Sequence, residues 1–356
     1  ELYGASVSPL VRRVGDYQTT GLYCGFMDDR FALPGDRVLA PMLRFLEEIL
    51  LDFPTEGEGF LPAFVEGEKK NLISTIESER NDKRTYAMGK LLKTMCRGDS
   101  FGLPRLGEPE DVAAIDPAGL LTHYRKILRE SRIEIFYVGS APAEAVAEYL
   151  SPLVSRLGGR EGLLPPQTPF HPCPGQDVTE TMEVSQGKLC MGFVTPIVNR
   201  DAEFPAMQVF NTVFGAGMTS KLFLNVREKL SLCYYASSNY VRSKGILTVS
   251  SGIESADYQR ALDEILHQLQ EVRDGHWEPW ELEGARSTMR SALASLPDSQ
   301  GALENYCLGQ AATGQSEDPE TMQRLLDQVT PERIQAAAQS VTLDTVYFLH
   351  GKEDAR

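Results

Sequence analysis

A turn motif recurs in the two halves of the chain, and this repeat constrains the fold more than any other feature of the sequence. The pattern V-R-x-x-G occurs at Val11–Gly15 and again at Val241–Gly245. Each copy precedes a stretch that is typical of a β-strand, at Leu22–Met27 and at Ile246–Gly252. Because the same landmarks recur in the same order, we expect two domains of similar fold.

Helical patterns follow these strands in both halves. Leucines at helical spacing predict an amphipathic helix at Ala40–Leu50, and its counterpart is expected at Arg260–Val272. A long helical pattern at Phe64–Met95 then occupies the first half, and Glu278–Leu296 and Ala302–Ala312 occupy the equivalent stretch of the second. Helices therefore form most of both predicted domains.

A similar sequence pattern occurs near the end of each repeat. Asp116–Pro117 and Thr330–Pro331 each combine an N-cap residue with proline at the first helical position. Each predicted helix leads into a short apolar strand that ends in glycine, at Ile133–Gly139 and at Thr345–Gly351. Strands in meander order with helices between them predict an α+β class. We expect each domain to be a mostly antiparallel sheet with helices packed on one face.

The two repeats differ at their beginnings. In the second half, Lys188–Arg227 precedes the shared motif and is expected to form a strand, a connection and two helices. No equivalent stretch precedes Val11, so we expect the first domain to lack its N-terminal strand and helix. Any chemistry carried by those elements would then be missing from this sequence.

A segment rich in proline and glycine separates the halves. Leu157–Gln176 has no helical period, which is typical of a linker on the surface. We therefore predict an N-terminal domain at residues 1–156, a linker at 157–184 and a C-terminal domain at 185–356.

Composition excludes several kinds of partner. A net charge of −15 over 356 residues argues against nucleic acid and against an anionic membrane surface, because both would require clustered Lys and Arg. No run of apolar residues is long enough to predict a transmembrane helix. The six cysteines are widely scattered and form no C-x-x-C pair, which favours free thiols in a reducing compartment. We therefore expect a cytoplasmic protein.

The segment Gly215–Tyr235 resembles the second-domain motif of the insulinase/pitrilysin family of zinc peptidases. In that motif a Gly-rich turn opens a helix S-[RK]-L-F-x-x-[LV]-R-E-[KR], and x-L-x-Y follows. The matching residues are Gly215, Gly217, Ser220, Lys221, Leu222, Phe223, Arg227, Glu228, Lys229, Leu232 and Tyr234. The resemblance extends over nearly the whole chain, and it implies two homologous α+β domains.

The resemblance implies a role for two of these residues. In the family, the Arg and Tyr of this motif face the active site, bind the substrate backbone and help stabilise the tetrahedral intermediate. Arg227 and Tyr234 occupy those positions. A fixed cation and a phenol donor can hold a peptide carbonyl as negative charge develops on its oxygen.

The family's zinc site has no counterpart in this sequence. The resemblance implies a His-x-x-Glu-His helix and a distant Glu ligand, with the Glu of the motif as general base. The five histidines are too far apart for such a pair: His123, His171, His267, His276 and His350. The register that places the preceding Glu at Glu68 puts Thr75 at the distant ligand position, and threonine is a poor zinc ligand. We therefore expect no metal or other cofactor in this chain.

Some members of the family work as pairs, in which one subunit carries zinc and the other carries the Arg/Tyr motif. This chain resembles the second kind, a non-catalytic subunit of a bacterial two-subunit processing peptidase that is inactive alone. The expected partners are a zinc-bearing catalytic subunit with His-x-x-Glu-His and a peptide substrate. The linker at Leu157–Gln176 would then act as a hinge.

Two other hypotheses remain open at this point. The chain could be a fragment of a complete zinc metalloendopeptidase whose His-x-x-Glu-His helix lies upstream of Glu1, although Thr75 argues against this. It could also be a structural assembly subunit without peptide chemistry, like the respiratory-complex core subunits that resemble the family.

Overall fold

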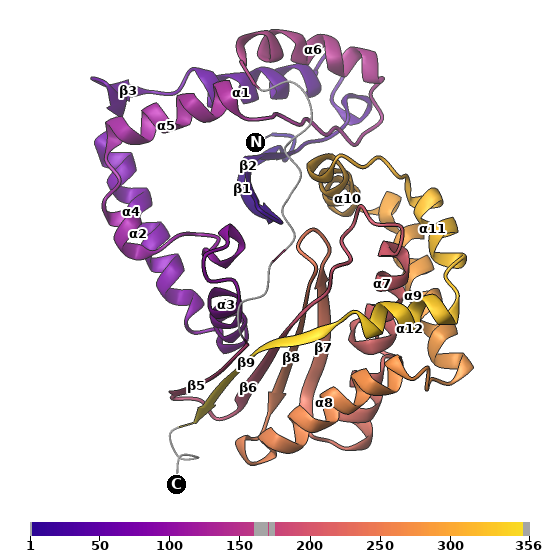
Figure 1. The fold of residues 1–356 in the computed structure, drawn as a ribbon. Helices are drawn as coiled ribbons and strands as arrows, with labels where there is room; N and C mark the ends of the chain where they lie inside the picture. The colour runs from indigo at the N-terminus through magenta and orange to yellow at the C-terminus, as the bar shows by residue number, and fades with distance from the viewer. Residues whose placement is uncertain (1, 160–169, 171–174, 352–356) are drawn as a thin grey trace. The chain divides into compact units, whose positions relative to one another are not determined.

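The computed structural model describes residues 2–159, 170 and 175–351, which form two compact units (Figure 1). Unit 1 consists of Glu1–Arg13, Tyr17–Glu77 and Arg105–Pro165, and unit 2 of Val14–Asp16, Ser78–Pro104 and Pro166–Arg356. The α+β class is confirmed, because helices and antiparallel-rich sheets make up the described residues. Most of the predicted hinge at Leu157–Gln176 lies outside the described residues.

Unit 2 is built on a five-stranded sheet with the strand order β5-β9-β6-β8-β7. Its strands are β5 (Gln176–Met182), β6 (Gly187–Val194), β7 (Cys233–Val241), β8 (Ile246–Ile253) and β9 (Thr342–Gly351). All neighbours pair antiparallel except β5 and β9, which are parallel. The linker predicted at 157–184 was too long at its C-terminal end, because β5 lies within that range. Its alternating exposed and half-buried residues give it a face that packs, as a strand requires.

A layer of helices covers one face of this sheet. The layer contains α7 (Phe204–Asn211), α8 (Tyr258–Arg273), α9 (Pro279–Ala294), α11 (Pro319–Asp327) and α12 (Pro331–Gln339), and α10 (Gln300–Thr313) follows α9 in the chain. Apolar side chains from these five helices and from β6, β7, β8 and β9 form one large core. Every residue of β8 is buried, as expected for a strand covered on both faces.

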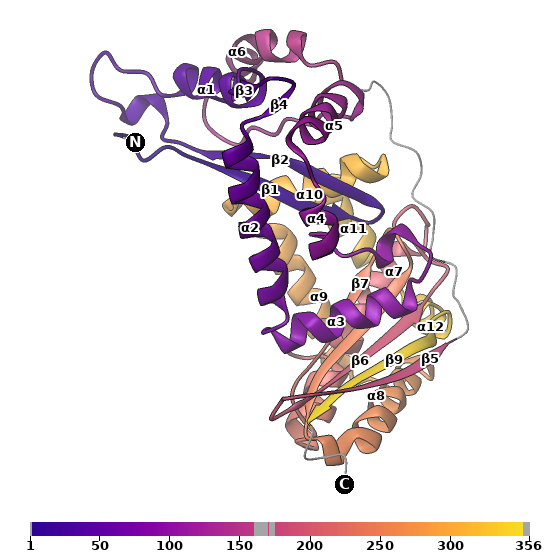
Figure 2. The same ribbon diagram turned by 90° about the vertical axis from the view of Figure 1, so that its left-hand side faces the viewer.

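A helix from the first half of the sequence covers the opposite face. The predicted helix at Phe64–Met95 is broken into α2 (Pro62–Glu79) and α3 (Lys83–Met95), because Asp82 accepts hydrogen bonds from the backbone of Arg84 and Thr85 and starts a new helix. Figure 2 shows α3 lying along the face of the sheet that contains β6 and β9. Ala87 and Leu91 of α3 pack against these two strands. The expected helical layer is therefore present, and α3 adds a second layer that the sequence did not predict.

Among the described residues, unit 1 contains two ladders of two strands each and five α-helices. The elements are β1 (Ser6–Val14), β2 (Tyr17–Gly25), α1 (Leu39–Leu51), β3 (Thr55–Glu56), β4 (Gly59–Phe60), α2, α4 (Pro109–Ala113), α5 (Pro117–Glu130) and α6 (Ala143–Arg156). Leu39 and Leu43 of α1 pack against Val146 of α6. The strand predicted at Ile133–Gly139 was wrong, because no strand within residues 2–159 pairs with it. Tyr137 from this segment packs against the α1–α6 cluster instead.

The repeated motif forms the turn of a hairpin in both halves. Gly15 lies between β1 and β2 with φ 60°, and Gly245 lies between β7 and β8 with φ 66°. Only glycine adopts this left-handed conformation without a steric cost. At Gly245 the close approach to the backbone of Thr195 adds a second reason for glycine, since an added Cβ would lie 2.2 Å from the Thr195 carbonyl oxygen.

A buried lysine joins three loops of unit 2. The Nζ atom of Lys244 lies 2.7 Å from Oδ1 of Asp16 and 3.0 Å from Oδ2 of Asp99, and the Lys244 side chain is 1% exposed. Asp16 also accepts a hydrogen bond from Ser100 Oγ. Two carboxylates therefore balance one buried ammonium, and the turn of the first hairpin is held to the turn of the second.

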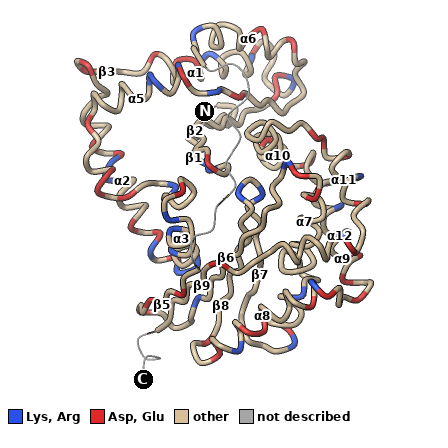
Figure 3. The backbone as a smooth tube through the Cα atoms, viewed as in Figure 1, with Lys and Arg blue, Asp and Glu red and all other residues tan. Residues whose placement is uncertain are grey.

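Charged residues are distributed unevenly among the helices, and α7 contains none. Figure 3 shows both signs along α8, whereas Lys and Arg dominate α3 through Lys83, Arg84, Lys90 and Lys93. Within the described part of the chain, no helix has both the length and the apolar character needed to cross a membrane.

We expect Gly245→Ala to destabilise unit 2 by about 3 kcal/mol, because the new Cβ adds left-handed strain and overlaps the Thr195 carbonyl. Urea unfolding followed by circular dichroism measures this change. Gly98→Ala is the matched control, because Gly98 also has a positive φ but an added Cβ would meet no atom within 4 Å. The control should lose only about 1 kcal/mol, and equal losses in the two variants would contradict the overlap.

We expect Lys244→Met to lower the free energy of unfolding by about 3 kcal/mol, because Asp16 and Asp99 would lose the cation between them. This loss of unfolding free energy should lie at the low end of the range for broken buried ion pairs, because both carboxylates keep some contact with solvent. The same urea titration measures it, and a loss below about 1 kcal/mol would show that the ion pairs behave like surface pairs.

Candidate functional site

Arg227 lies on a π-helix in unit 2. The helix η4 (Leu222–Lys229) follows a shorter π-helix, η3 (Thr212–Ala216), and leads into β7. Leu222 and Val226 are buried in the core, which leaves Arg227 near the solvent side of the last turn. π-Helices are rare and occur frequently at functional sites, so a whole helix of this type is a notable local feature.

The Gly-rich turn allows the two π-helices to pack against β7. A Cβ at Gly215 would lie 2.6 Å from Ser238 Oγ of β7 and 2.7 Å from Leu222 Cδ1 of η4. Glycine at this position therefore permits η3, η4 and β7 to lie in close contact. This contact is the physical reason for at least one of the glycines in the motif.

A sharp reversal connects Arg227 to Tyr234. The backbone N–H of Leu230 donates to Asn225, and that of Leu232 donates to Val226 at 3.0 Å, which ends the helix. Between them Ser231 takes a left-handed conformation with φ 50°, the one such non-glycine residue among those described. Left-handed residues of this kind commonly end helices, and here the turn directs the chain straight into β7.

Tyr234 lies at a β-bulge. Cys233 pairs with Ile253 and Tyr235 pairs with Gly252, so Tyr234 is an extra residue on β7. Cys233 and Ala236 point into the core, whereas the Tyr235 ring lies under Arg84 of α3 at 4.2 Å. The bulge breaks the alternation of side chains, as bulges near active sites do, and the Tyr234 side chain remains 67% exposed.

Arg227 and Tyr234 line one open pocket of about 390 Å³. The lining residues are Arg227, Glu228, Ser231, Leu232, Cys233, Tyr234 and Glu254. Arg227 Nη1 lies 3.3 Å from Glu228 Oε1, and the Arg227 guanidinium carbon lies 4.7 Å from the centre of the Phe223 ring. The guanidinium is thus held over an aromatic ring but stays 40% exposed, so it can reach a ligand.

The chemistry of the pocket suits binding better than nucleophilic attack. Burial raises the pKa of the Cys233 thiol. The thiol therefore stays protonated and unreactive at neutral pH. The remaining polar side-chain groups are a guanidinium, a phenol, the Ser231 hydroxyl and two carboxylates, and the first three can donate hydrogen bonds to a carbonyl oxygen.

Thr75 does not provide a metal ligand. It lies on α2 in unit 1, and its hydroxyl donates to the backbone oxygen of Asn71 at 2.8 Å. Across residues 2–159, 170 and 175–351, no three His, Cys, Asp or Glu side chains are grouped so that they could hold a metal ion. Of the histidines, His276 lies beside Glu271 and His350 beside Thr181, while His171 lies outside the described residues. The described side chains therefore do not fit a zinc ion.

The sequence did not predict a buried ion pair that lies beside η4. Lys221 is part of the recognised motif, but its partner Glu281 lies on α9, sixty residues further along the chain. No local pattern connects these positions, and only the packing of α9 against η3 and η4 brings them together. Lys221 stands directly before the apolar stretch Leu222–Leu224, and this position was the one signal in the local sequence.

Comparison with known proteins supports the expected family. Residues 114–289 match the family model of the peptidase M16 inactive domain. A Bacillus subtilis (strain 168) protein named "Probable inactive metalloprotease YmfF" is 30% identical over 355 residues, which cover 100% of this chain and 83% of the relative.

Solved structures agree with this match. A conserved protein from Enterococcus faecalis V583 has a TM-score of 0.86 and 28% identity, with 99% of this chain and 83% of that chain covered. A peptidase M16 inactive domain from Pseudomonas fluorescens has a TM-score of 0.76 at 16% identity and covers 98% of this chain and 81% of its own, a likeness of fold alone. The chain belongs to the peptidase M16 family and is a homologue of its inactive metalloproteases.

Proposed function

We propose that this chain is a non-catalytic subunit of a two-subunit, zinc-dependent processing peptidase, in which it binds the peptide substrate through Arg227 and Tyr234. The observation that carries the proposal is that both side chains line one open pocket, although the described residues hold no metal-ligand cluster. The similarity to YmfF, which is named as a probable inactive metalloprotease, supports a non-catalytic role.

In the proposed mechanism the work is divided between two chains. A catalytic partner of the same family, carrying His-x-x-Glu-His, supplies the zinc and the activated water. Arg227 places a permanent cation, and Tyr234 a phenol donor, beside a carbonyl of the bound peptide. Because both donors are preorganised by the helix end and the bulge, they stabilise the developing oxyanion without having to reorient.

The position of β7 favours an extended peptide as the ligand. β7 is the edge strand of its sheet among the described residues, and Tyr234 lies at its beginning. A peptide backbone can approach such an edge, whereas a bulky folded ligand cannot enter a pocket of about 390 Å³. The proposal includes a cytoplasmic setting.

We expect Arg227→Ala to lower kcat/KM of the assembled peptidase by about 100-fold and Tyr234→Phe by about tenfold, because each variant removes a donor to the oxyanion. The measurement uses this chain together with the zinc-bearing M16 family member of the same organism and a fluorogenic peptide. Arg260→Ala and Tyr149→Phe are matched controls, because both side chains are exposed and lie outside the pocket.

The controls should retain full activity. If Arg227→Ala and Tyr234→Phe also retain it, while wild-type chain is still required for turnover, the chain acts as an assembly subunit and the proposed peptide-binding role is wrong. If the chain cleaves the peptide alone, the division between two subunits is wrong.

A further inference from the structure

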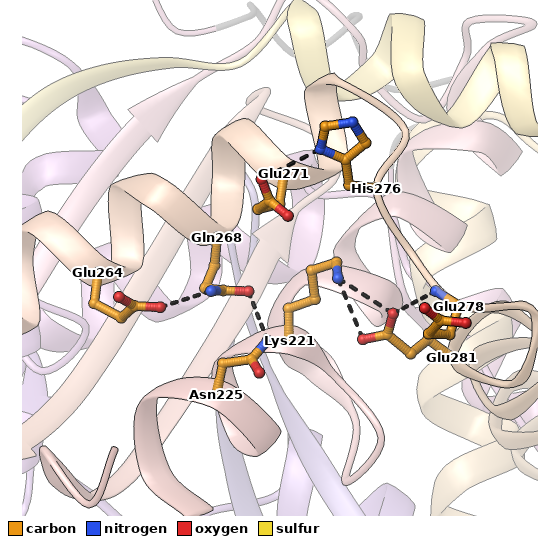
Figure 4. A network of polar contacts seen from close by, with 8 residues as sticks. All are labelled: Lys221, Asn225, Glu264, Gln268, Glu271, His276, Glu278 and Glu281. Atoms are coloured by element: carbon orange, nitrogen blue, oxygen red, sulfur yellow. Dashed lines mark hydrogen bonds and ion pairs between the residues drawn. The ribbon is translucent and has the colours of Figure 1, made fainter. Parts of the chain in front are cut away.

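A buried ion pair lies at the beginning of the helix that carries Arg227. Lys221 Nζ is 3.2 Å from Oε2 and 3.3 Å from Oε1 of Glu281, and the two side chains are 7% and 6% exposed (Figure 4). Neither residue lines the pocket of Arg227 and Tyr234. The pair therefore cannot contact a peptide that is bound in this pocket.

Glu281 is itself held in place by the backbone. It lies in the first turn of α9 and accepts a hydrogen bond from the N–H of Glu278 at 2.7 Å, as part of a capping box. The next turn of α9 places Ala285 in the core. Lys221 is thus bonded to a carboxylate whose position is set by a helix start and by core packing.

A second polar contact holds the middle of η4. Asn225 Nδ2 donates to Gln268 Oε1 at 2.7 Å, and Gln268 Nε2 donates to Glu264 Oε1 at 2.6 Å (Figure 4). Gln268 is buried on α8. Lys221 and Asn225 therefore fasten η4 to α9 and to α8, one helical turn apart, just before the turn that carries Arg227.

We propose that Lys221 and Glu281 are positioning residues that set the direction of Arg227, an inference that rests on the proposed peptide-binding function. The same residues could instead form an α-helix, which is the more common type. Because the two helix types differ in residues per turn, the side chain of Arg227 would then point in a different direction. The Lys221–Glu281 and Asn225–Gln268 contacts hold two successive turns in place and oppose a change from π-helix to α-helix. Loss of the first contact frees the helix start and moves Arg227 relative to Tyr234, which stays fixed on β7.

The buried pair is better explained by positioning than by stability. Burial of two charges costs free energy that their attraction only partly returns, so a well-packed apolar pair is often as stable or more stable. An ion pair with a defined geometry instead selects one arrangement of the elements that it joins. Here those elements are α9 and the helix that bears Arg227.

The test is a double-mutant cycle in the assembled peptidase. We expect Lys221→Met to lower kcat/KM about tenfold, because displacement of a substrate-binding group by a fraction of an ångström is costly. The double variant Lys221→Met with Arg227→Ala should be no slower than Arg227→Ala alone, since Lys221 acts through Arg227. Lys221→Arg, which keeps the charge, should restore most of the lost activity.

Lys244→Met is the matched control. It also removes a buried lysine that faces carboxylates of unit 2, but it lies at the β7–β8 turn, away from η4. It should lose stability to a similar degree and keep its kcat/KM. Hydrogen exchange of the amides of residues 222–229 provides a readout without the partner, and it should become faster in Lys221→Met but not in Lys244→Met. Should Lys221→Met fail to fold, Glu281→Gln serves in its place, because it keeps the shape of the side chain.

The possible results distinguish the positioning role of Lys221 from the peptide-binding role of Arg227. If Arg227→Ala impairs turnover while Lys221→Met does not, or if the two losses multiply in the double variant, the positioning role is wrong and the peptide-binding role stands. If Arg227→Ala has no effect, both proposals are wrong. Equal losses of kcat/KM in Lys221→Met and Lys244→Met would show that only stability had changed and would also overturn the positioning role.

Discussion

Burial of both faces of the five-stranded sheet is the constraint on which the rest of unit 2 depends. Helices cover one face and α3 covers the other, so β8 is buried along its whole length. A side chain of this sheet can therefore reach solvent most readily at an edge strand or at an interruption in a strand. Tyr234 meets both conditions, because it lies at a bulge in the edge strand β7. Arg227 is brought beside it by the left-handed turn at Ser231.

The pocket presents two hydrogen-bond donors that suit the proposed binding of a peptide carbonyl, the guanidinium of Arg227 and the phenol of Tyr234. A guanidinium and a phenol remain exposed on a rigid scaffold, and the nearby thiol of Cys233 is kept protonated because burial raises its pKa. At the position where the family resemblance places a zinc ligand, the hydroxyl of Thr75 bonds to its own helix. The similarity to a relative named as a probable inactive metalloprotease supports the proposed role as a partner subunit.

The sequence predicted what depends on local pattern and missed what depends on distant contacts. The glycine turns at Gly15 and Gly245, the helix starts at Pro117 and Pro331 and most helix positions followed from short-range signals. The motif placed Arg227 and Tyr234 together because only a helix end and a turn separate them. In contrast, the packing of α3 on the second sheet, the unpaired segment at Ile133–Gly139 and the Lys221–Glu281 pair are decided by elements far apart in the chain. The bulge and the π-helix are also set by packing, so residue types alone did not indicate them.

The division of labour between a peptide-binding chain and a zinc-bearing partner is tested most directly by the zinc content of the natural full-length protein. The protein would be purified without chelators, separated from any partner and analysed by atomic spectroscopy, with the zinc-bearing M16 family member of the same organism as the positive control. The account predicts no stoichiometric zinc in this chain and a full complement in the partner. Close to one zinc ion per chain would contradict it, and would show that this protein is a complete metallopeptidase.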